Sequence, residues 1–318
     1  MKVSVYCMVF NHEPYLRDAL DGFVRQQTDF EYEVIVHDDA STDRSREIIE
    51  EYAKNYPAII KPVFQQENQY SKGVRVVDAF VLPRLTGEYV AVCEGDDYWT
   101  DPMKLQLQVD FLDKHPDYVA CVHNTMKLDM MTGVESRMFS HTQDEDITVA
   151  EALAVGGGCY HTSSLMYRRE YIYNRPAFFQ KAKGFADYPM AIYLTLSGKM
   201  RFINRTMSYY RFGSISSWTR KTRADTNKIA MHHQYVVDML EEVDRYTDGA
   251  HHAQIEYVIL QNRYKILYYK EQYAQLRKMP YAQLYRQMPA SYRAKTYLKQ
   301  FLKVPYRFYR KLVYGTKD

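Results

Sequence analysis

Hydrophobic positions in the first third of the chain follow two alternating periods. Short apolar runs predict buried strands at Val3 to Val9, Glu33 to Val36, Ile59 to Phe64 and Glu88 to Cys93. Between these runs, apolar residues recur at helical spacing, which predicts helices with one buried face. These helices are expected over Leu16 to Val24, Ile48 to Ala53 and Val74 to Leu85. The alternation of strand and helix predicts a mostly parallel α/β sheet with flanking helices.

The middle third is less regular. Strand patterns occur at Tyr118 to His123, Thr125 to Leu128, Ser163 to Arg168 and Met200 to Asn204, and helical patterns at Leu105 to Leu112 and Met190 to Leu196. Thr148 and Glu151 have the spacing of a capping box, which predicts a short helix ending at the three glycines 156–158. From about Thr222 onward the pattern is helical. We therefore expect a sheet domain in residues 1–220 and a helical extension in residues 221–318.

The composition excludes several classes of protein. With 46% hydrophobic and 15% aromatic residues among 318, the chain has too much apolar content to be mainly disordered. The sequence lacks the apolar run of about 18 residues that crosses a membrane, and Met1 is not followed by a signal-peptide pattern. The four cysteines form no CxxC pair and have no histidine at zinc-ligand spacing, so we expect reduced thiols in a cytoplasmic protein.

Charge is distributed unevenly, although the net charge is only +3. Residues 286–318 hold nine Lys or Arg and one acid, so the rest of the chain carries a net charge of −5. Nucleic acid is a poor partner for an acidic body without a nucleic-acid-binding motif. The basic tail indicates contact with some other anionic surface.

The tail also repeats its apolar positions after eleven residues, close to the helical period, so that both sets lie on one face. The first set is Tyr297, Leu298, Phe301 and Leu302; the second is Phe308, Tyr309, Leu312 and Val313; Pro305 lies between them. Basic residues flank that face, which is typical of a helix lying in a membrane interface. The alternative is a helix packed on the body, with lysine side chains reaching to solvent.

Carboxylates gather where two predicted strands end. Asp38 and Asp39 follow one strand, and Glu94, Asp96 and Asp97 follow another. Because ligands of parallel sheets bind beyond the carboxyl ends of the strands, both clusters are candidates for a site. Three acids within four residues repel one another unless a cation lies among them, and oxygen ligands suit Mg²⁺ or Mn²⁺. The alternatives are a turn or helix cap for the first cluster and a solvated loop for the second.

At these residues the chain resembles the family 2 glycosyltransferases, whose fold is GT-A. The resemblance is carried by VSVYCMVFNHEPYLRDAL, VIVHDDASTDRS, ENQYSKG, HTSSLMYRR and GFADYPMAIYLTLSGK, and above all by GEYVAVCEGDDYWTDPMKLQLQVDFL. These segments span residues 1 to about 218 and are most similar to enzymes that build bacterial surface polysaccharides. The resemblance implies a nucleotide-sugar donor, a saccharide or lipid-linked acceptor and a divalent cation.

The resemblance also implies roles for individual residues. Asp39 matches the aspartate that hydrogen-bonds the nucleotide base, while Phe10 and Asn11 lie where the first strand lines the base pocket. Asp96 and Asp97 match the acidic motif that binds metal and sugar nucleotide. Glu94 stands at the first acidic position of that motif, and Asp97 is favoured as the metal ligand over Asp96.

Asp187 matches the general base of the family, with Ala186 in place of a frequent glutamate. A carboxylate that removes the proton of the attacking hydroxyl contributes about 10²–10⁴-fold to the rate. One base and one in-line displacement imply inversion at the sugar carbon. Asp187 has a second interpretation as the cap of the helix that starts at Tyr188 and Pro189, and the two are compatible.

The chain departs from the family pattern at one place. Tyr210 and Arg211 are not followed by the histidine that binds metal in related enzymes, so water or phosphate could complete the coordination. Arg211 or Arg220 is a candidate contact of the donor diphosphate, as is Lys72, which could equally be a surface lysine. His161 is a pocket candidate whose alternative is a structural role.

Two other functions remain as alternatives. The missing histidine is compatible with an inactive nucleotide-sugar-binding or scaffold protein. A sugar nucleotidyltransferase is a second enzyme class, but it needs a glycine-rich phosphate loop where this chain has NHEPYLRD. The chain also lacks, at this place, the glycine motif that a nicotinamide dehydrogenase needs. We expect a cytoplasmic enzyme that could work at the inner membrane face through residues 286–318.

Overall fold

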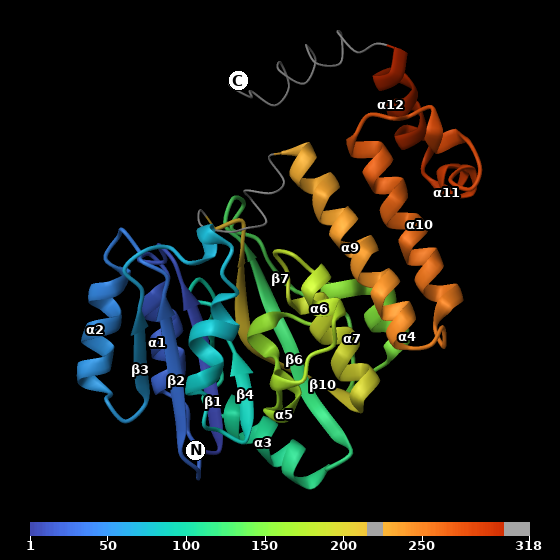
Figure 1. Cartoon of the computed structure of the whole chain (residues 1–318). Coiled ribbons are helices and arrows are strands. Elements are labelled where there is room, and N and C mark those ends of the chain that lie inside the picture. Colours follow the sequence, from blue (N-terminus) through green and yellow to red (C-terminus); the bar gives the residue numbers. More distant parts are fainter. Residues whose placement is uncertain (215–224, 302–318) are drawn as a thin grey trace. The chain divides into compact units, whose positions relative to one another are not determined.

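The structure is a computed structural model that describes residues 1–214 and 225–301 (Figure 1). The chain divides into two compact units: one comprises Met1–Pro176 and Ala186–Arg220, the other Ala177–Phe185 and Lys221–Asp318. The boundary expected at residue 220 falls in 215–224, outside the described residues. The short segment Ala177–Phe185 groups with the helical unit, which the pattern along the chain does not reveal.

The first unit is built on one sheet, to which ten strands of the described chain contribute. Its order is β3-β2-β1-β4-β9-β6-β10-β5, with β7 on β6 and β8 on β10. The strands are β1 Val3–Val9, β2 Tyr32–Asp38, β3 Ile60–Phe64, β4 Tyr89–Val92, β5 Tyr98–Trp99, β6 Tyr118–Asp129, β7 Glu135–Arg137, β8 Glu145–Ile147, β9 Met166–Arg168 and β10 Lys199–Phe212.

Strands β1 to β4 are parallel, and so are β6 and β10. The short strands β5, β7, β8 and β9 pair antiparallel with their neighbours. The predicted mixed, mostly parallel α/β architecture is therefore confirmed. Because β1, β2 and β4 run in one direction, the polar residues that follow them lie at the same edge of the sheet.

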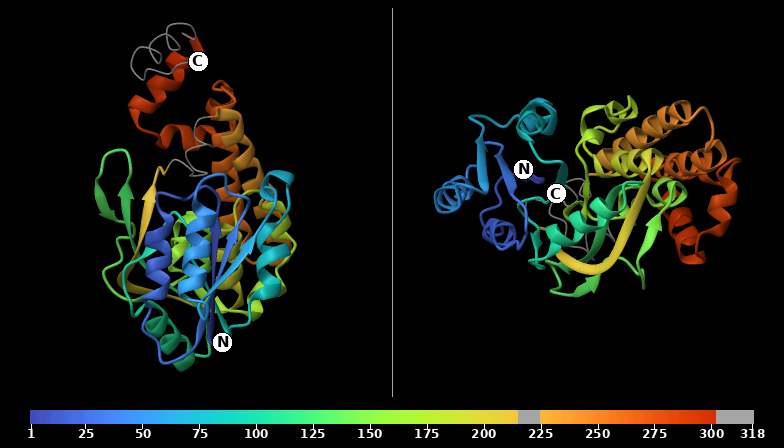
Figure 2. Two further views of the ribbon diagram at one scale, coloured as in Figure 1. Left: turned by 90° about the vertical axis from the view of Figure 1, so that its left-hand side faces the viewer. Right: turned by 90° about the horizontal axis from the view of Figure 1, so that it is seen from below.

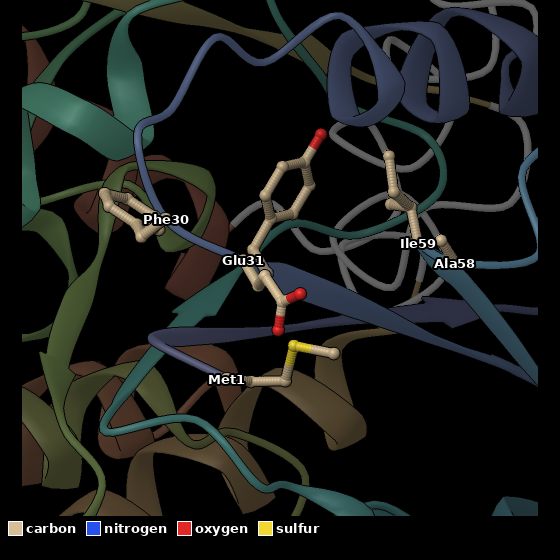
Figure 3. A pocket seen from close by; sticks show the side chains of 6 residues that line it. Met1, Phe30, Glu31, Ala58 and Ile59 are labelled. Atoms are coloured by element: carbon tan, nitrogen blue, oxygen red, sulfur yellow. The ribbon is translucent and has the colours of Figure 1, made fainter.

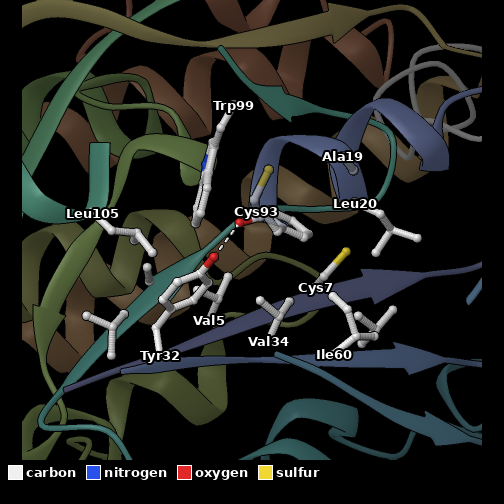
Figure 4. Packing of buried hydrophobic residues seen from close by; sticks show 14 of the residues in the cluster. Val5, Cys7, Ala19, Leu20, Tyr32, Val34, Ile60, Cys93, Trp99 and Leu105 are labelled. Atoms are coloured by element: carbon white, nitrogen blue, oxygen red, sulfur yellow. Dashed lines mark hydrogen bonds between the residues drawn. The ribbon is translucent and has the colours of Figure 1, made fainter. Parts of the chain in front are cut away.

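Helices cover the sheet because each has an apolar face to bury. The helices of the first unit are α1 Leu16–Val24, α2 Ser45–Asn55, α3 Lys104–Lys114, α4 Val149–Val155, α5 Glu170–Tyr173 and α7 Asp187–Ser197. Leu20 of α1 and Leu105 of α3 pack with Val5 and Val34 of the sheet in one buried cluster (Figure 4). All four cysteines are buried and free.

Strand β6 continues through a polar residue at which the sequence predicts a break. Asn124 is fully buried within the strand. Its side-chain amide donates to the carbonyl of Phe139, and its Oδ1 accepts from the amide of Thr125. Since the polar atoms of Asn124 are hydrogen-bonded, the strand continues across the predicted gap.

Strand β10 is longer than the predicted strand Met200 to Asn204. It extends to Phe212 and is strongly curved (Figure 2). Its register against β6 shifts on either side of Thr206, so bulges absorb the polar residues at which the apolar pattern ends. The extension matters because it carries Arg211 to the acidic turn after β4.

The predicted helix from Val74 to Leu85 is wrong as a regular α-helix. The segment forms a π-helical turn at Val77–Val81 and a 3₁₀ turn at Leu82–Arg84. Pro83 has no backbone N–H to continue an α-helical pattern. Two further short turns matter below, the 3₁₀ turns Gly156–Gly158 and Thr162–Ser164.

The second unit is helical in its described part. Its helices are α6 Phe178–Lys181, α9 Thr226–Tyr246, α10 His252–Tyr269, α11 Ala282–Gln287 and α12 Ala290–Phe301. Tyr264, Tyr273, Leu276 and Leu284 form its buried cluster, with further tyrosines packed around them. Tyrosine accounts for 31 of the 318 residues, and several tyrosines of this region serve as core. Among the described residues, no helix has both the length and the apolar character needed to cross a membrane.

Candidate active site

The loops after β1 and β2 are tied to each other at the carboxyl edge of the sheet. The amide of Asn11 donates to Ser41 Oγ at 2.9 Å, and Asn11 Oδ1 accepts from the amide of Thr42 at 2.8 Å. Asn11 has a positive φ of 57°, a conformation that asparagine tolerates better than most residues. Asn11 thus shapes this edge, and half-buried Phe10 precedes it. Their contact with a nucleotide base stays a prediction.

Asp39 organises the next loop along this edge. It is 4% exposed, and its two carboxylate oxygens accept the backbone amides of Gln69 at 2.9 Å and Tyr70 at 3.0 Å. Each oxygen has a second lone pair, so a further hydrogen bond to a ligand is chemically open. Lys72, in the same loop, forms an ion pair with Glu67 and is about half exposed. The predicted contacts of Asp39 with the nucleotide base and of Lys72 with the donor diphosphate stay predictions.

Asp97 is the most enclosed carboxylate of the acidic turn after β4. It is 4% exposed; its Oδ1 accepts the amide of Arg211 at 2.9 Å, and its Oδ2 lies 3.6 Å from Nε2 of His161. Burial raises the pKa of the Asp97 carboxyl well above its ordinary value, and the charges of Asp96 and Glu94 add to the rise. The turn therefore holds more negative charge than its hydrogen bonds compensate.

The two other acids of the turn are more open. Asp96 accepts a hydrogen bond from Ser214 Oγ at 2.9 Å. Glu94 is exposed to solvent. Protein atoms near its carboxylate reduce the hydration of the charged form and raise the pKa of Glu94, and the negative charges of Asp96 and Asp187 raise it further. Because the charge of Asp187 acts on Glu94, the first carboxylate of α7 lies within electrostatic range of the acidic turn.

Arg211 holds the acidic turn in place. Its guanidinium group donates to the carbonyl oxygen of Asp96 at 3.0 Å and forms an ion pair with Asp18 of α1. The same group lies over the rings of Tyr98, at 4.3 Å, and Tyr15, at 5.2 Å. Arg211 thus joins β10, α1 and the turn. A contact with the donor diphosphate stays a prediction, and Arg220 lies outside the described residues.

Asp187 is the first residue of α7, and neighbouring residues fix the position of its carboxylate. Its Oδ1 accepts the amide of Tyr188 at 2.9 Å, and Tyr160 Oη donates to its carbonyl oxygen at 3.1 Å. A Cβ atom at Gly157 would lie 2.2 Å from Asp187 Oδ2, so only glycine leaves room for the carboxylate. Burial raises the pKa of Asp187, which favours proton uptake at neutral pH.

Sequence patterns predicted the acids of this site and named His161 as a pocket candidate, but they did not reveal the role of Gly157. The three glycines 156–158 mark the end of α4 in the sequence, and only the fold shows Gly157 beneath Asp187. His161 was one of several pocket candidates, and the fold places it beside Asp97. Its only signal in the sequence is the polar run HTSS ahead of an apolar strand.

The acidic turn offers carboxylate oxygens to a divalent cation. The described residues contain no group of three or more His, Cys, Asp or Glu side chains arranged to hold a metal ion. Mg²⁺ and Mn²⁺ often bind through one or two carboxylates and complete their coordination with substrate phosphates and water. Asp97 is buried, its negative charge is only partly compensated by hydrogen bonds, and Asp96 lies beside it. This arrangement fits that mode of binding.

A small apolar pocket lies elsewhere in the first unit (Figure 3). It has a volume of about 170 Å³ and is lined by Met1, Phe30, Glu31, Tyr32, Ala58 and Ile59. Met1 precedes β1, Tyr32 begins β2 and Ile59 precedes β3, so this pocket is at the amino ends of the strands. It is separate from the acidic residues at the carboxyl ends.

Both the sequence of this chain and its fold are similar to those of known proteins. Residues 4–175, more than half of the chain, match the family described as glycosyl transferase family 2. The uncharacterized protein Rv1520 of Mycobacterium tuberculosis is 37% identical over 217 residues, which are 68% of this chain. The aligned region is 60% of that relative, so this chain spans about three fifths of its length.

Two solved structures share the fold. The first is Staphylococcus aureus TarS (residues 1–349) in complex with UDP-GlcNAc, with a TM-score of 0.60, 18% identity, and coverage of 90% of this chain and 78% of that one. The second is the mannosyltransferase PcManGT from Pyrobaculum calidifontis in complex with GDP-Man and Mn²⁺, with a TM-score of 0.55, 18% identity, and coverage of 95% and 84%. The predicted GT-A fold is thereby confirmed.

Proposed function

Because this chain belongs to glycosyl transferase family 2, we propose that it transfers a sugar from a nucleotide-sugar donor to a hydroxyl group of a saccharide acceptor. One observation carries the proposal. The charge of Asp187 acts on Glu94, so the Asp187 carboxylate lies within electrostatic range of the acidic turn that follows β4 and holds Asp96 and Asp97. Structures of the same fold that hold UDP-GlcNAc or GDP-Man support a nucleotide-sugar donor.

The donor nucleotide is proposed to bind across the loops after β1 and β2. Asp39 has lone pairs left for the base, Phe10 can stack on it, and Asn11 keeps the two loops together. Lys72 can reach phosphate once it leaves Glu67, and Arg211 supports the diphosphate side by fixing the acidic turn.

Asp97 and Asp96 are proposed to hold Mg²⁺ or Mn²⁺, with Glu94 at the margin of the site. A bound divalent ion supplies positive charge that offsets the charge of the departing diphosphate. The Mn²⁺ complex of PcManGT supports this use of a metal. The protein's own contribution is to concentrate negative charge and keep Asp97 fixed through the amide of Arg211.

Asp187 is proposed to act as the general base. The acceptor oxygen attacks the anomeric carbon and gives its proton to a carboxylate oxygen of Asp187, while the bond from that carbon to the diphosphate oxygen breaks. Attack opposite the leaving group inverts the configuration. The raised pKa of Asp187 makes this carboxylate a better proton acceptor near neutral pH.

The acceptor is proposed to be a surface-polysaccharide or lipid-linked saccharide reached at a membrane surface. Within the helical unit, Thr296 is the buried residue of α12, while Tyr297, Leu298 and Phe301 are exposed on this helix. Arg293 and Lys295 are exposed beside them. Aromatic and aliphatic groups with a basic rim suit an anionic lipid interface. The second apolar set of the predicted repeat lies outside the described residues.

The transfer proposal is tested with the full chain and a panel of UDP- and GDP-sugars. A matching donor raises the melting temperature, since a ligand that binds only the folded state stabilises it. Asp187→Asn is expected to keep that stabilisation and to lose transfer by about 10²–10⁴-fold. Anomeric configuration is read from the product by NMR.

Asp113→Asn is a matched control, because Asp113 pairs with Lys2 and Tyr89 away from the site. If no nucleotide sugar stabilises the protein, or if Asp187→Asn transfers at the wild-type rate, the proposed reaction is wrong. Retention of configuration at the anomeric carbon would contradict the single-displacement step alone.

A further inference from the structure

His161 lies against the acidic turn from a segment far away in the sequence. It precedes the 3₁₀ turn Thr162–Ser164, and its side chain is 11% exposed. Its ring packs on that of Tyr210 in β10, with 4.4 Å between the ring centres. The imidazole is thereby held with Nε2 toward Asp97.

The contact between His161 and Asp97 is not a hydrogen bond. Nε2 and Oδ2 are 3.6 Å apart, beyond the range in which N–H groups donate to oxygen. Oδ1 of the same carboxylate already accepts the amide of Arg211. A nitrogen and an oxygen therefore face each other at a separation that two ligands of one cation can adopt.

A chain of hydroxyl groups indicates which imidazole nitrogen carries the proton. Ser163 Oγ donates to Ser208 Oγ at 2.9 Å, and Ser208 Oγ lies 3.0 Å from Thr125 Oγ1. Since the single hydroxyl proton of Ser163 is used there, the 2.8 Å contact between Ser163 Oγ and His161 Nδ1 requires a proton on Nδ1. Nε2 then keeps a free lone pair.

The opposite tautomer has its own signature. The amide of Ser163 lies 3.3 Å from Nδ1 and would donate to it if Nε2 carried the proton. The contact of Nδ1 with Ser163 Oγ is shorter than its contact with the Ser163 amide. We therefore assign the proton to Nδ1, and Nε2 faces the Asp97 carboxylate with its lone pair. Histidines that bind metals commonly donate their second N–H to a neighbouring oxygen, as Nδ1 does here.

We propose that His161 binds the divalent ion through Nε2, next to Asp97, and that the ion is preferentially Mn²⁺ rather than Mg²⁺. The inference rests on the metal-assisted transfer proposed above. A nitrogen ligand favours a transition-metal ion, whereas Mg²⁺ prefers oxygen ligands alone. Ser163, Ser208 and Thr125 orient the ring and act as positioning residues.

The test is electron paramagnetic resonance of Mn²⁺ bound to the full chain in the presence of UDP or GDP. Wild-type protein is expected to show nitrogen coupling from a coordinated imidazole, and ¹⁵N-histidine labelling is expected to change that coupling. In His161→Gln the coupling disappears and Mn²⁺ affinity falls by about tenfold or more. His141→Gln removes a histidine that pairs with Glu145 and is expected to change neither readout.

A second variant addresses a His161→Gln protein that fails to fold. In Ser208→Ala, the hydroxyl proton of Ser163 can turn to Nδ1 and favour the tautomer with Nε2 protonated, so Mn²⁺ affinity is expected to fall several-fold. The inference is overturned if wild-type protein binds Mn²⁺ without imidazole coupling, or if His161→Gln keeps both coupling and affinity.

The same measurements separate this inference from the proposed reaction. If the wild type binds no Mn²⁺ and transfers sugar in the presence of EDTA, the His161 inference falls and the transferase stands. If the wild type binds Mn²⁺ through His161 and no donor is turned over, the metal ligand stands and the proposed reaction fails.

Discussion

The acidic edge of the first unit and the exposed face of α12 are built in opposite ways. The acidic edge collects Asp18, Asp97, His161, Asp187 and Arg211, which are far apart in the sequence. The α12 face consists of residues one helical turn apart. A tertiary site can be spoiled by a change at a distant supporting residue, whereas a helical face is changed only through its own residues.

Charge and burial also differ between the two regions. At the acidic edge, Asp97 is enclosed, so neighbouring charges act on it over short distances with little water between them. On α12, basic and apolar groups are exposed and any attraction to lipid is screened by salt. Substitutions at the edge should therefore act on the reaction, and substitutions on α12 should act on the location of the enzyme.

Among the changes that compare these two regions, Gly157→Ala is expected to have the largest effect. Its Cβ would displace the Asp187 carboxylate, and a misplaced catalytic group can cost about 10²-fold in rate. We expect kcat to fall by that amount while donor binding, measured by thermal shift, is kept. Gly158→Ala is the control, because its Cβ meets only the Val155 Cγ1 atom at 3.2 Å. Equal rate losses in both variants would contradict the role of Gly157.

Arg211→Lys is expected to weaken the fold at the acidic edge. Lysine cannot make the same contacts with Asp18, the Asp96 carbonyl and two aromatic rings. The free energy of unfolding should fall by about 1–3 kcal/mol in chemical denaturation. Arg44→Lys, in an exposed pair with Glu47, should change it by about 0.5 kcal/mol or less. If both variants lost a similar free energy of unfolding, the contacts of Arg211 would contribute no more to stability than a surface ion pair.

Replacing Tyr297, Leu298 and Phe301 together by serine tests the α12 face. Loss of their apolar area should weaken binding to phosphatidylglycerol vesicles about tenfold or more in co-sedimentation. Transfer to a soluble acceptor should be unchanged. Met131→Ser with Val134→Ser removes exposed apolar groups of the first unit and serves as control. Undiminished vesicle binding by the triple variant would show that this face does not contact lipid.

The last comparison concerns Lys104, which lies away from both regions and is fully buried with its ammonium group 3.9 Å from the Trp99 ring. Burial lowers the pKa of Lys104 to about 7 from an unfolded value of 10.5. Between these values the unfolded chain binds the proton more tightly, so this group makes stability rise with pH across the window. The melting temperature of wild type minus that of Lys104→Met should increase by about 5–10 °C from pH 7 to 10. A constant difference would contradict the lowered pKa.

Local patterns predicted most elements of the fold but not their extent. Apolar runs place β1, β2 and β4, because each strand is buried and therefore continuous in character. Asn124 ended a predicted strand because a lone polar residue looks like a break, and only its hydrogen bonds to Phe139 and Thr125 show otherwise. The second half of β10 was missed for a similar reason.

The sequence by itself determined the alternation of strands and helices, the acids at the strand ends and the helical period of the last third. These are properties of neighbouring residues, and hydrophobic burial enforces them locally. Only the tertiary structure decided that Arg211 turns to Asp18, that Gly157 lies beneath Asp187 and that His161 faces Asp97. Such contacts join segments through the register of a twisted, bulged sheet, and local periodicity carries no information about that register.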